Sequence, residues 1–174
     1  MESPALVIRP AAVHDVPMIE ALVEPLALQG VLLAKDRVVY YESVQEFLIA
    51  ERTTATGTEV VGCGALHVMW RDIAEIRTLV TSPSARGTGV GHRLVQELLE
   101  RARTIGVKQV FCLTFEVDFF RRQGFRVLEK QSQLIDPEVF MELLRSHDEG
   151  VAEFLDLARV KPNTLGNTRM LRDL

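Results

Sequence analysis

The stretch RGTGVGHRLVQELLE, residues 86–100, sets three alternating glycines behind an arginine and ahead of an amphipathic helical pattern. Glycine lets the backbone come close to a ligand, and a helix N-terminus offers unpaired N–H groups and a positive dipole end. Arg86 can add a charged, forked donor. The stretch therefore predicts a phosphate-binding loop, because a plain helix cap would need fewer glycines.

Two known phosphate-binding loops do not fit this stretch. A Walker loop needs Gly-Lys followed by Ser or Thr, which is missing here. A dinucleotide fingerprint needs GxGxxG directly after a strand, whereas GTGVG has a different spacing and SPSA stands in between. The remaining pattern, RGxGxG, resembles the acyl-CoA pyrophosphate loop of the GNAT acetyltransferase superfamily.

Composition limits the classes of function. The 174 residues suit one domain, which we expect to span residues 1–174, and the formal net charge of -4 argues against a sequence-independent nucleic-acid binder. We expect no membrane association and a cytoplasmic location, because no apolar run could cross a bilayer and the start lacks a signal-peptide layout. Cys63 and Cys112 are expected to be buried thiols, and without metal-ligand spacing we expect no metal.

Hydrophobic periodicity and turn residues predict an alternating order of elements. The expected strands are residues 5–9, 59–70, 72–81, 107–114, 125–130 and 167–174, and the expected helices are residues 11–30, 38–51, 90–105, 117–123, 138–146 and 149–158. Asp15 is the expected cap of the first helix, and Gly106 the expected end of the third. The order strand, loop, helix, strand predicts a right-handed crossover between two parallel neighbours, 72–81 and 107–114. The expected class is α/β (α+β), with a mixed sheet and helices on both faces.

The resemblance to the GNAT superfamily extends beyond the loop. EIRTLVTSPSARGTGVGHRLVQELLERARTIGVKQVFCLT and DFFRRQGFRVLE look like that family's strand, loop, helix, strand and aromatic helix end. The resemblance implies a mixed, mostly antiparallel sheet splayed at the acyl-CoA site, with acetyl-CoA as co-substrate. It also implies a set of coenzyme-binding residues: Leu79, Val80 and Thr81 for the pantetheine, the loop Arg86, Gly87, Thr88, Gly89, Val90 and Gly91 for the pyrophosphate, and Phe120 with Arg122 or Arg121 nearby.

A narrower resemblance covers nearly the whole chain. VIRPAAVHDVPMIEALVEPLALQGVLLAKDR and the final TRMLRDL are similar to the opening and the close of the acetyltransferase domain of bacterial N-acetylglutamate synthases, in the stand-alone short form of the actinobacterial type. The resemblance implies acetyl transfer to the α-amino group of L-glutamate, the first step of arginine biosynthesis, with L-glutamine as a close rival. The region 136–162 is longer than the expected connection and has no predicted role.

The chemistry needs a base, because an ammonium group cannot attack a thioester. Glu75 is the candidate base, and an ordinary strand-edge carboxylate is the alternative. A backbone N–H near Val80 is expected to stabilise the tetrahedral oxyanion. A thiol pKa of roughly 8.5 makes the coenzyme thiolate a good leaving group, so Phe120, where many family members carry a tyrosine, does not exclude catalysis.

An anionic acceptor also needs cations. Lys35 and Arg77 are candidates, Thr168 and Arg169 occupy the family's basic-hydroxyl pair, and the backbone carbonyl of Thr114 could accept from the amino group. We expect Arg77 to share a face with Glu75 only if their strand twists or bulges.

Two other functions stay open. One is acetylation of a protein N-terminus, a lysine or a drug amine, which would call for an open acidic groove. The other is a non-catalytic acyl-CoA-binding sensor. An exposed sheet edge and the C-terminal helices favour a homodimer.

Overall fold

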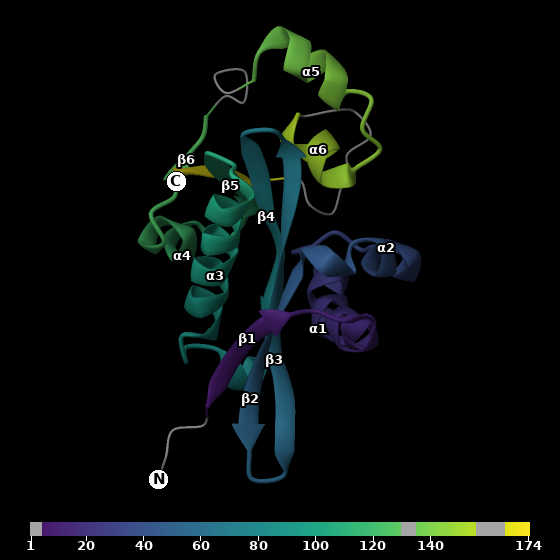
Figure 1. Cartoon of the computed structure of the whole chain (residues 1–174), viewed down its shortest axis with the longest axis vertical. Helices are drawn as coiled ribbons and strands as arrows, with labels where there is room; N and C mark the ends of the chain where they lie inside the picture. The colour runs from purple at the N-terminus through teal and green to yellow at the C-terminus, as the bar shows by residue number, and fades with distance from the viewer. Residues whose placement is uncertain (1–4, 130–134, 156–165) are drawn as a thin grey trace.

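The computed structural model describes residues 5–129, 135–155 and 166–174. These residues form one sheet with the strand order β1-β2-β3-β4-β5-β7-β6 (Figure 1). The strands are β1 (Leu6–Pro10), β2 (Phe47–Thr54), β3 (Gly57–Trp70), β4 (Ile73–Thr81), β5 (Gln109–Thr114), β6 (Arg126–Val127) and β7 (Thr168–Asp173). Only the β4/β5 pair is parallel among the described strands, which confirms the predicted mixed, mostly antiparallel sheet and the crossover neighbours.

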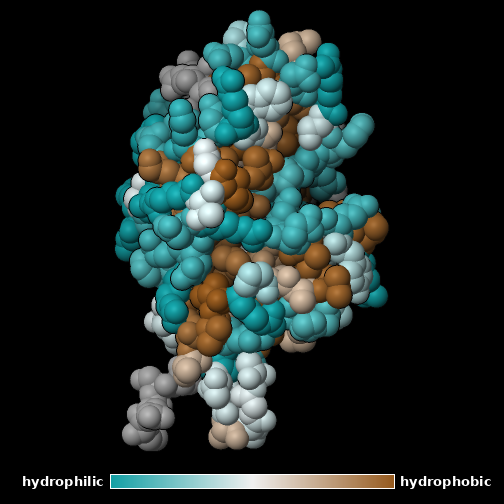
Figure 2. All heavy atoms as spheres, viewed as in Figure 1, coloured by the Kyte–Doolittle hydropathy of each residue, from teal (hydrophilic) through white to brown (hydrophobic). Residues whose placement is uncertain are grey.

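Helices cover both faces of the sheet. Figure 1 shows α1 (Val16–Leu28) and α2 (Arg37–Glu42) on one side, and α3 (Val90–Ile105) and α4 (Val117–Arg122) on the other. Figure 2 shows apolar patches among hydrophilic side chains on the α1 and α2 side, where Leu28 and Val38 are exposed. Short 3-10 turns at Val13–Asp15, Val44–Glu46 and Pro83–Ala85 complete this part of the chain.

The predicted helix over residues 38–51 is wrong in its second half. After α2 and a single turn, the chain becomes strand β2, in which Phe47 and Ile49 pack toward α1 while Leu48 and Ala50 pack toward α3. A strand covered on both faces is apolar at every position, so its sequence cannot be told from a buried helical segment by periodicity.

The predicted α3 is confirmed. Its apolar positions form the expected buried stripe, and Gly106 ends the helix with a φ of 99°. Asp15 does stand at the cap position of α1, but its side chain makes no capping hydrogen bond there. Instead the carboxylate accepts two hydrogen bonds from Arg9, at 2.7 and 2.8 Å, and one from the amide of Ala12.

Strands β4 and β5 pair over a short stretch and then diverge. They pair only from Ile73/Gln109 to Glu75/Phe111, although β4 continues to Thr81. Beyond Glu75 one edge of β4 is therefore open, which is the splay that the resemblance implies. On its other edge the register against β3 shifts around Thr78, whose φ of 54° is left-handed.

A third group of helices lies at the end of the sheet where β3 turns into β4, beside the short stretch in which β4 and β5 are paired (Figure 1). Helices α5 (Pro137–Leu143) and α6 (Glu149–Phe154) confirm the two predicted helices in shorter form, and residues 156–158 of the second lie outside the described residues. Phe154 of α6 stacks on Phe111 of β5, with ring centroids 4.3 Å apart. The same apolar cluster contains Leu143 of α5, so both helices are anchored to the sheet beside the splay.

Candidate active site

A pocket of about 250 Å³ opens where β4 and β5 diverge. Its volume is below the range of roughly 300–1,000 Å³ typical of drug-sized ligands, so it suits a small metabolite. The lining residues come from the connection after α1, from β4, from the end of β5, from the start of α6 and from the approach to β7: Val31, Leu32, Leu33, Ala34, Lys35, Asp36, Val39, Glu75, Arg77, Thr78, Leu113, His147, Asp148, Glu149, Gly150, Glu153 and Asn167.

Glu75 and Arg77 form a buried ion pair on the floor of this pocket. Nε of Arg77 donates to Oε2 of Glu75 at 2.8 Å, and Nη2 lies 2.5 Å from the same oxygen. The expectation that the two side chains share a face only at a bulge is wrong. Positions i and i+2 of a strand point the same way, and the register shift lies beyond both residues.

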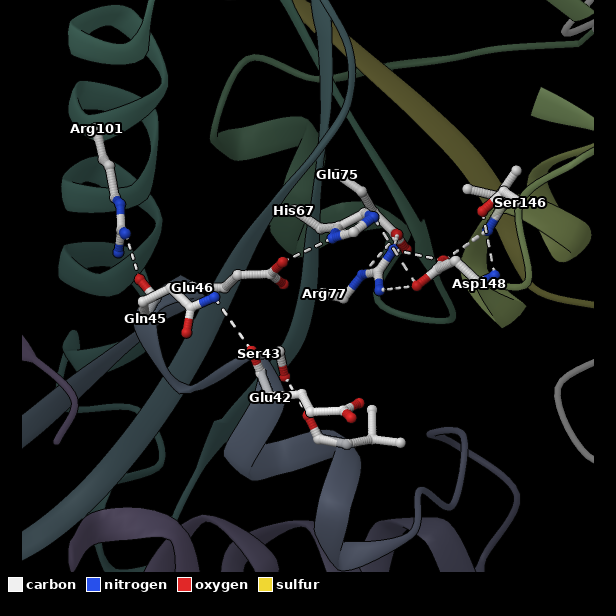
Figure 3. Close-up of polar contacts among 12 residues, drawn as sticks. Glu42, Ser43, Gln45, Glu46, His67, Glu75, Arg77, Arg101, Ser146 and Asp148 are labelled. Carbon is white, nitrogen blue, oxygen red and sulfur yellow. Dashed lines mark hydrogen bonds and ion pairs between the residues drawn. The ribbon is translucent and has the colours of Figure 1, made fainter. Parts of the chain in front are cut away.

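Asp148, at the N-cap of α6, holds the other side of the Arg77 guanidinium. Its two carboxylate oxygens accept from Nη1 and Nη2 at 2.7 and 2.9 Å. His67 of β3 extends the network, with Nδ1 2.8 Å from Oε1 of Glu46 and Nε2 3.9 Å from Oδ2 of Asp148 (Figure 3). The sequence predicts His67 to be a partly buried core residue; it is partly buried, but between two carboxylates.

Lys35 brings a second cation to the pocket from the loop before α2. Burial lowers the pKa of Lys35 from its ordinary value, and the neighbouring charge of Arg77 lowers it further, while Glu75, Asp148 and Glu46 oppose the shift. Among the residues that the structure describes, no carboxylate forms an ion pair with Lys35. Its ammonium group is therefore available to an anionic ligand.

The glycine loop leads into α3 with backbone donors exposed. Gly87 and Gly89 have φ of 75° and 86°, and a Cβ on either would meet nothing within 4 Å. The amides of Arg86 and Thr88 turn inward to carbonyls of the preceding turn. Within the described chain, the amides of Gly87, Gly89, Val90 and Gly91 have no backbone acceptor, since the first amides of a helix lack one. This geometry fits a bound pyrophosphate.

The open edge of β4 offers backbone groups to an extended ligand. Ser82 donates its amide to Val61 at 2.8 Å, so its pair in the ladder is hydrogen-bonded to β3. Alternation along an antiparallel ladder then directs the amide of Val80 to β3 as well and that of Thr81 to the open edge, whereas Leu79 lies within the register shift. The register thus argues against the amide of Val80 itself as the oxyanion donor and favours a neighbouring amide of β4.

The two phenylalanines of α4 have different surroundings: one is buried in the core and the other lies beside the coenzyme loop. Phe120 is buried edge-to-face between Phe119 and Phe125. Phe119, which the sequence analysis missed, lies beside the coenzyme loop, because a Cβ at Gly91 would stand 3.4 Å from its ring. Arg122 is exposed on the helix surface, and Arg121 pairs with Asp118 at 2.7 Å.

Three predicted substrate residues are not brought to the pocket. Thr114, whose backbone carbonyl is the predicted acceptor for the amino group, is not among the residues that line the pocket, whereas its neighbour Leu113 is. Thr168 pairs with Thr114 across the β5/β7 ladder. The guanidinium of Arg169 donates to the carbonyls of Glu153 and Phe154 at 3.0 and 3.1 Å, so it holds the C-terminal end of α6.

The described part of the region 136–162 supplies one side of the pocket, which the sequence did not predict. Asp148 and Gly150 come from this region, and a Cβ at position 150 would stand 2.7 Å from Oε2 of Glu75 and 2.9 Å from Nη2 of Arg77. The one signal in the sequence is an aspartate at a helix start, which by itself indicates only a cap.

The model of the Acetyltransferase (GNAT) family matches residues 24–125, more than half of the chain. The chain belongs to this family. An amino-acid acetyltransferase of Mycobacterium tuberculosis is 52% identical over 165 residues, which cover 95% of this chain and 92% of that protein. An amino-acid acetyltransferase of Neisseria meningitidis is 36% identical over 121 residues, but these cover only 27% of that protein.

Solved structures agree with the sequence relatives of this GNAT member. A crystal structure of a Mycobacterium tuberculosis protein in complex with CoA and NLQ matches with a TM-score of 0.90 and 51% identity, over 97% of this chain and 99% of that chain. N-acetylglutamate synthase from Neisseria gonorrhoeae, complexed with coenzyme A and N-acetyl-glutamate, matches with a TM-score of 0.74 and 26% identity, over 99% of this chain and 36% of that chain.

In the described parts of the chain, no group of three or more His, Cys, Asp or Glu side chains is arranged to hold a metal ion. No described helix is both long and apolar enough to span a membrane.

Proposed function

We propose that this GNAT member is an acetyl-CoA-dependent amino-acid N-acetyltransferase whose acceptor is the α-amino group of L-glutamate or L-glutamine. The observation that carries the proposal is the meeting of Glu75, Arg77 and Lys35 in one small pocket at the splay of the sheet. The relatives named amino-acid acetyltransferase support it. By this proposal residues 1–174 act as one domain in arginine biosynthesis, and the cytoplasmic location and the homodimer stay predictions.

The coenzyme binds to backbone groups at the N-terminus of α3 and along the open edge of β4. The free amides around Gly89 and the N-terminus of α3 bind its pyrophosphate, and Arg86 adds a charged donor. The pantetheine continues along the open edge of β4 past Thr81 and Leu79, as an added strand would. Since Glu75 marks the point where β4 and β5 separate, this path delivers the acetyl group to the pocket.

The residues of the pocket then perform acetyl transfer. Lys35 pairs with the α-carboxylate of the acceptor, and Glu75 takes a proton from its ammonium group, directly or through one water molecule. The described contacts of Glu75 all use Oε2, which leaves Oε1 to accept the proton. The amine nitrogen forms a bond to the acetyl carbon, and an amide on the edge of β4 stabilises the oxyanion. The carbon–sulfur bond then breaks, and the second proton of the nitrogen passes to the departing thiolate, so that the products are the N-acetylated amino acid and the free thiol of CoA.

Thiol release tests the proposal directly. The purified chain is mixed with acetyl-CoA and a panel of L-amino acids, a peptide with a free N-terminus, a lysine peptide and an aminoglycoside, and free thiol is followed with time. We expect release with L-glutamate or L-glutamine, together with the N-acetylated product in the mass spectrum. Release with a peptide or drug amine alone would favour another acetyltransferase, and tight coenzyme binding without release from any acceptor would favour a sensor.

A further inference from the structure

We propose that Asp148 is a specificity-determining residue: as a fixed counter-ion of Arg77, it makes the pocket favour an acceptor with an uncharged side-chain amide over a dicarboxylic acceptor. This inference rests on the proposed amino-acid acetyltransferase function. It assigns a role to the segment that carries α6, which lies outside the part of the chain matched by the family model.

Arg77 is already occupied by carboxylates of the protein. A guanidinium has five N–H donors, and contacts from Nε, Nη1 and Nη2 reach Glu75 on one side and Asp148 on the other. Its side chain is only 10% exposed. Burial disfavours the charged guanidinium, but the two carboxylates outweigh burial and raise the pKa of Arg77. A carboxylate of the acceptor could reach Arg77 only by displacing one of them.

Asp148 is held too firmly to be displaced easily. Its Oδ1 accepts the amide of Val151 at 3.0 Å and so caps α6, and its own amide donates to the hydroxyl of Ser146 at 3.1 Å. Moving the carboxylate away would break the cap of α6 as well as the bidentate ion pair. The close approach of α6 to the ion pair further requires Gly150, since any Cβ there would collide with Glu75 and Arg77.

Lys35 is the second cation of the described pocket lining, and no described carboxylate forms an ion pair with it. With Arg77 occupied, Lys35 can pair with one acceptor carboxylate, the α-carboxylate. A side-chain carboxylate would then lie near the carboxylates of Glu75 and Asp148 without a cation of its own, whereas an uncharged side-chain amide can donate to them.

The test compares acceptors of equal length that differ in charge. In the unmodified protein, kcat/KM for L-glutamine and for L-glutamate γ-methyl ester should exceed that for L-glutamate. Asp148→Asn keeps the shape and the capping ability of the side chain but removes its charge. We expect it to raise kcat/KM for glutamate relative to glutamine at least ten-fold, through a lower KM for glutamate. Glu138→Gln, which removes an exposed charge from α5, is the matched control and should leave the ratio unchanged.

A second variant guards against misfolding. Asp148→Ser also retains a capping side chain without charge, and we expect the same direction of change. Calorimetric titration of each acceptor into the CoA-bound protein gives the ratio of the Kd values for glutamate and glutamine without turnover. The role of Asp148 is overturned if the unmodified protein prefers glutamate. It is also overturned if the folded variants keep the glutamine-to-glutamate ratios of kcat/KM and of affinity within about two-fold of those of the unmodified protein. Binding of glutamine in preference to glutamate without acetylation of any acceptor would instead contradict the proposed function.

Discussion

Replacing Gly89 by leucine should weaken coenzyme binding far more than it weakens the fold. Gly89 is the N-cap of α3 and has a φ of 86°, in the left-handed region, and a Cβ there would meet nothing within 4 Å. The backbone strain costs about 1–2 kcal/mol. For a chain of this length that corresponds to a fall in Tm of about 2–8 °C. By the proposed function, a leucine side chain at the N-cap would also cover neighbouring amides that bind the pyrophosphate.

The loss of affinity can be worked from the hydrogen bonds. Two amide–phosphate bonds, each contributing about 1.5–3 kcal/mol to a charged partner, correspond to a Kd increase of about 100-fold or more. Gly106→Leu is the matched control, because Gly106 ends the same helix with a φ of 99° and equally open surroundings. It should show a similar loss of Tm without the loss of affinity.

Isothermal titration calorimetry with CoA and thermal unfolding measure the two quantities on the same samples. The reasoning fails if Gly89→Leu binds CoA within about two-fold of the unmodified protein. It also fails if Gly106→Leu loses as much affinity, because strain rather than blocked amides would then explain the effect.

Three further predictions concern the pocket and the buried thiols. Glu75→Gln should lower kcat about 100-fold or more with the Kd for CoA unchanged; a kcat within about two-fold of that of the unmodified protein would exclude the base role. Because the pKa of Lys35 is lowered, its charge is present at low pH and lost as pH rises, below the ordinary lysine value of 10.5. The KM for the acceptor should therefore rise as pH increases toward 10.5. In Lys35→Arg the side chain stays charged, so the part of this rise that is due to Lys35 should disappear. Burial raises the pKa of Cys63 to about 12 and that of Cys112 well above its ordinary value, so neither thiol should react with a disulfide reagent at pH 8 until the protein is unfolded; rapid labelling of folded protein would contradict this.

The sequence alone determined the elements whose signals are local. The alternating glycines, the apolar stripe of α3 and Gly106 each act within a few residues, so the coenzyme loop and its helix were predicted with nearly correct bounds. The Glu75–Arg77 pair is also local, because the two-residue repeat of a strand puts both side chains on one face. Strand β2 was missed because both of its faces are buried, which removes the alternation that would have identified it.

Only the tertiary structure decided which side chains share the pocket. Asp148 lies 71 residues from Arg77 in sequence, and their contact exists because α6 packs on β5 where β4 turns away. Arg169, predicted to bind substrate, instead holds the end of that helix. Local patterns specify what a segment can form, but the charge that surrounds a buried cation depends on which distant segments pack against it, and that choice is made by the core as a whole.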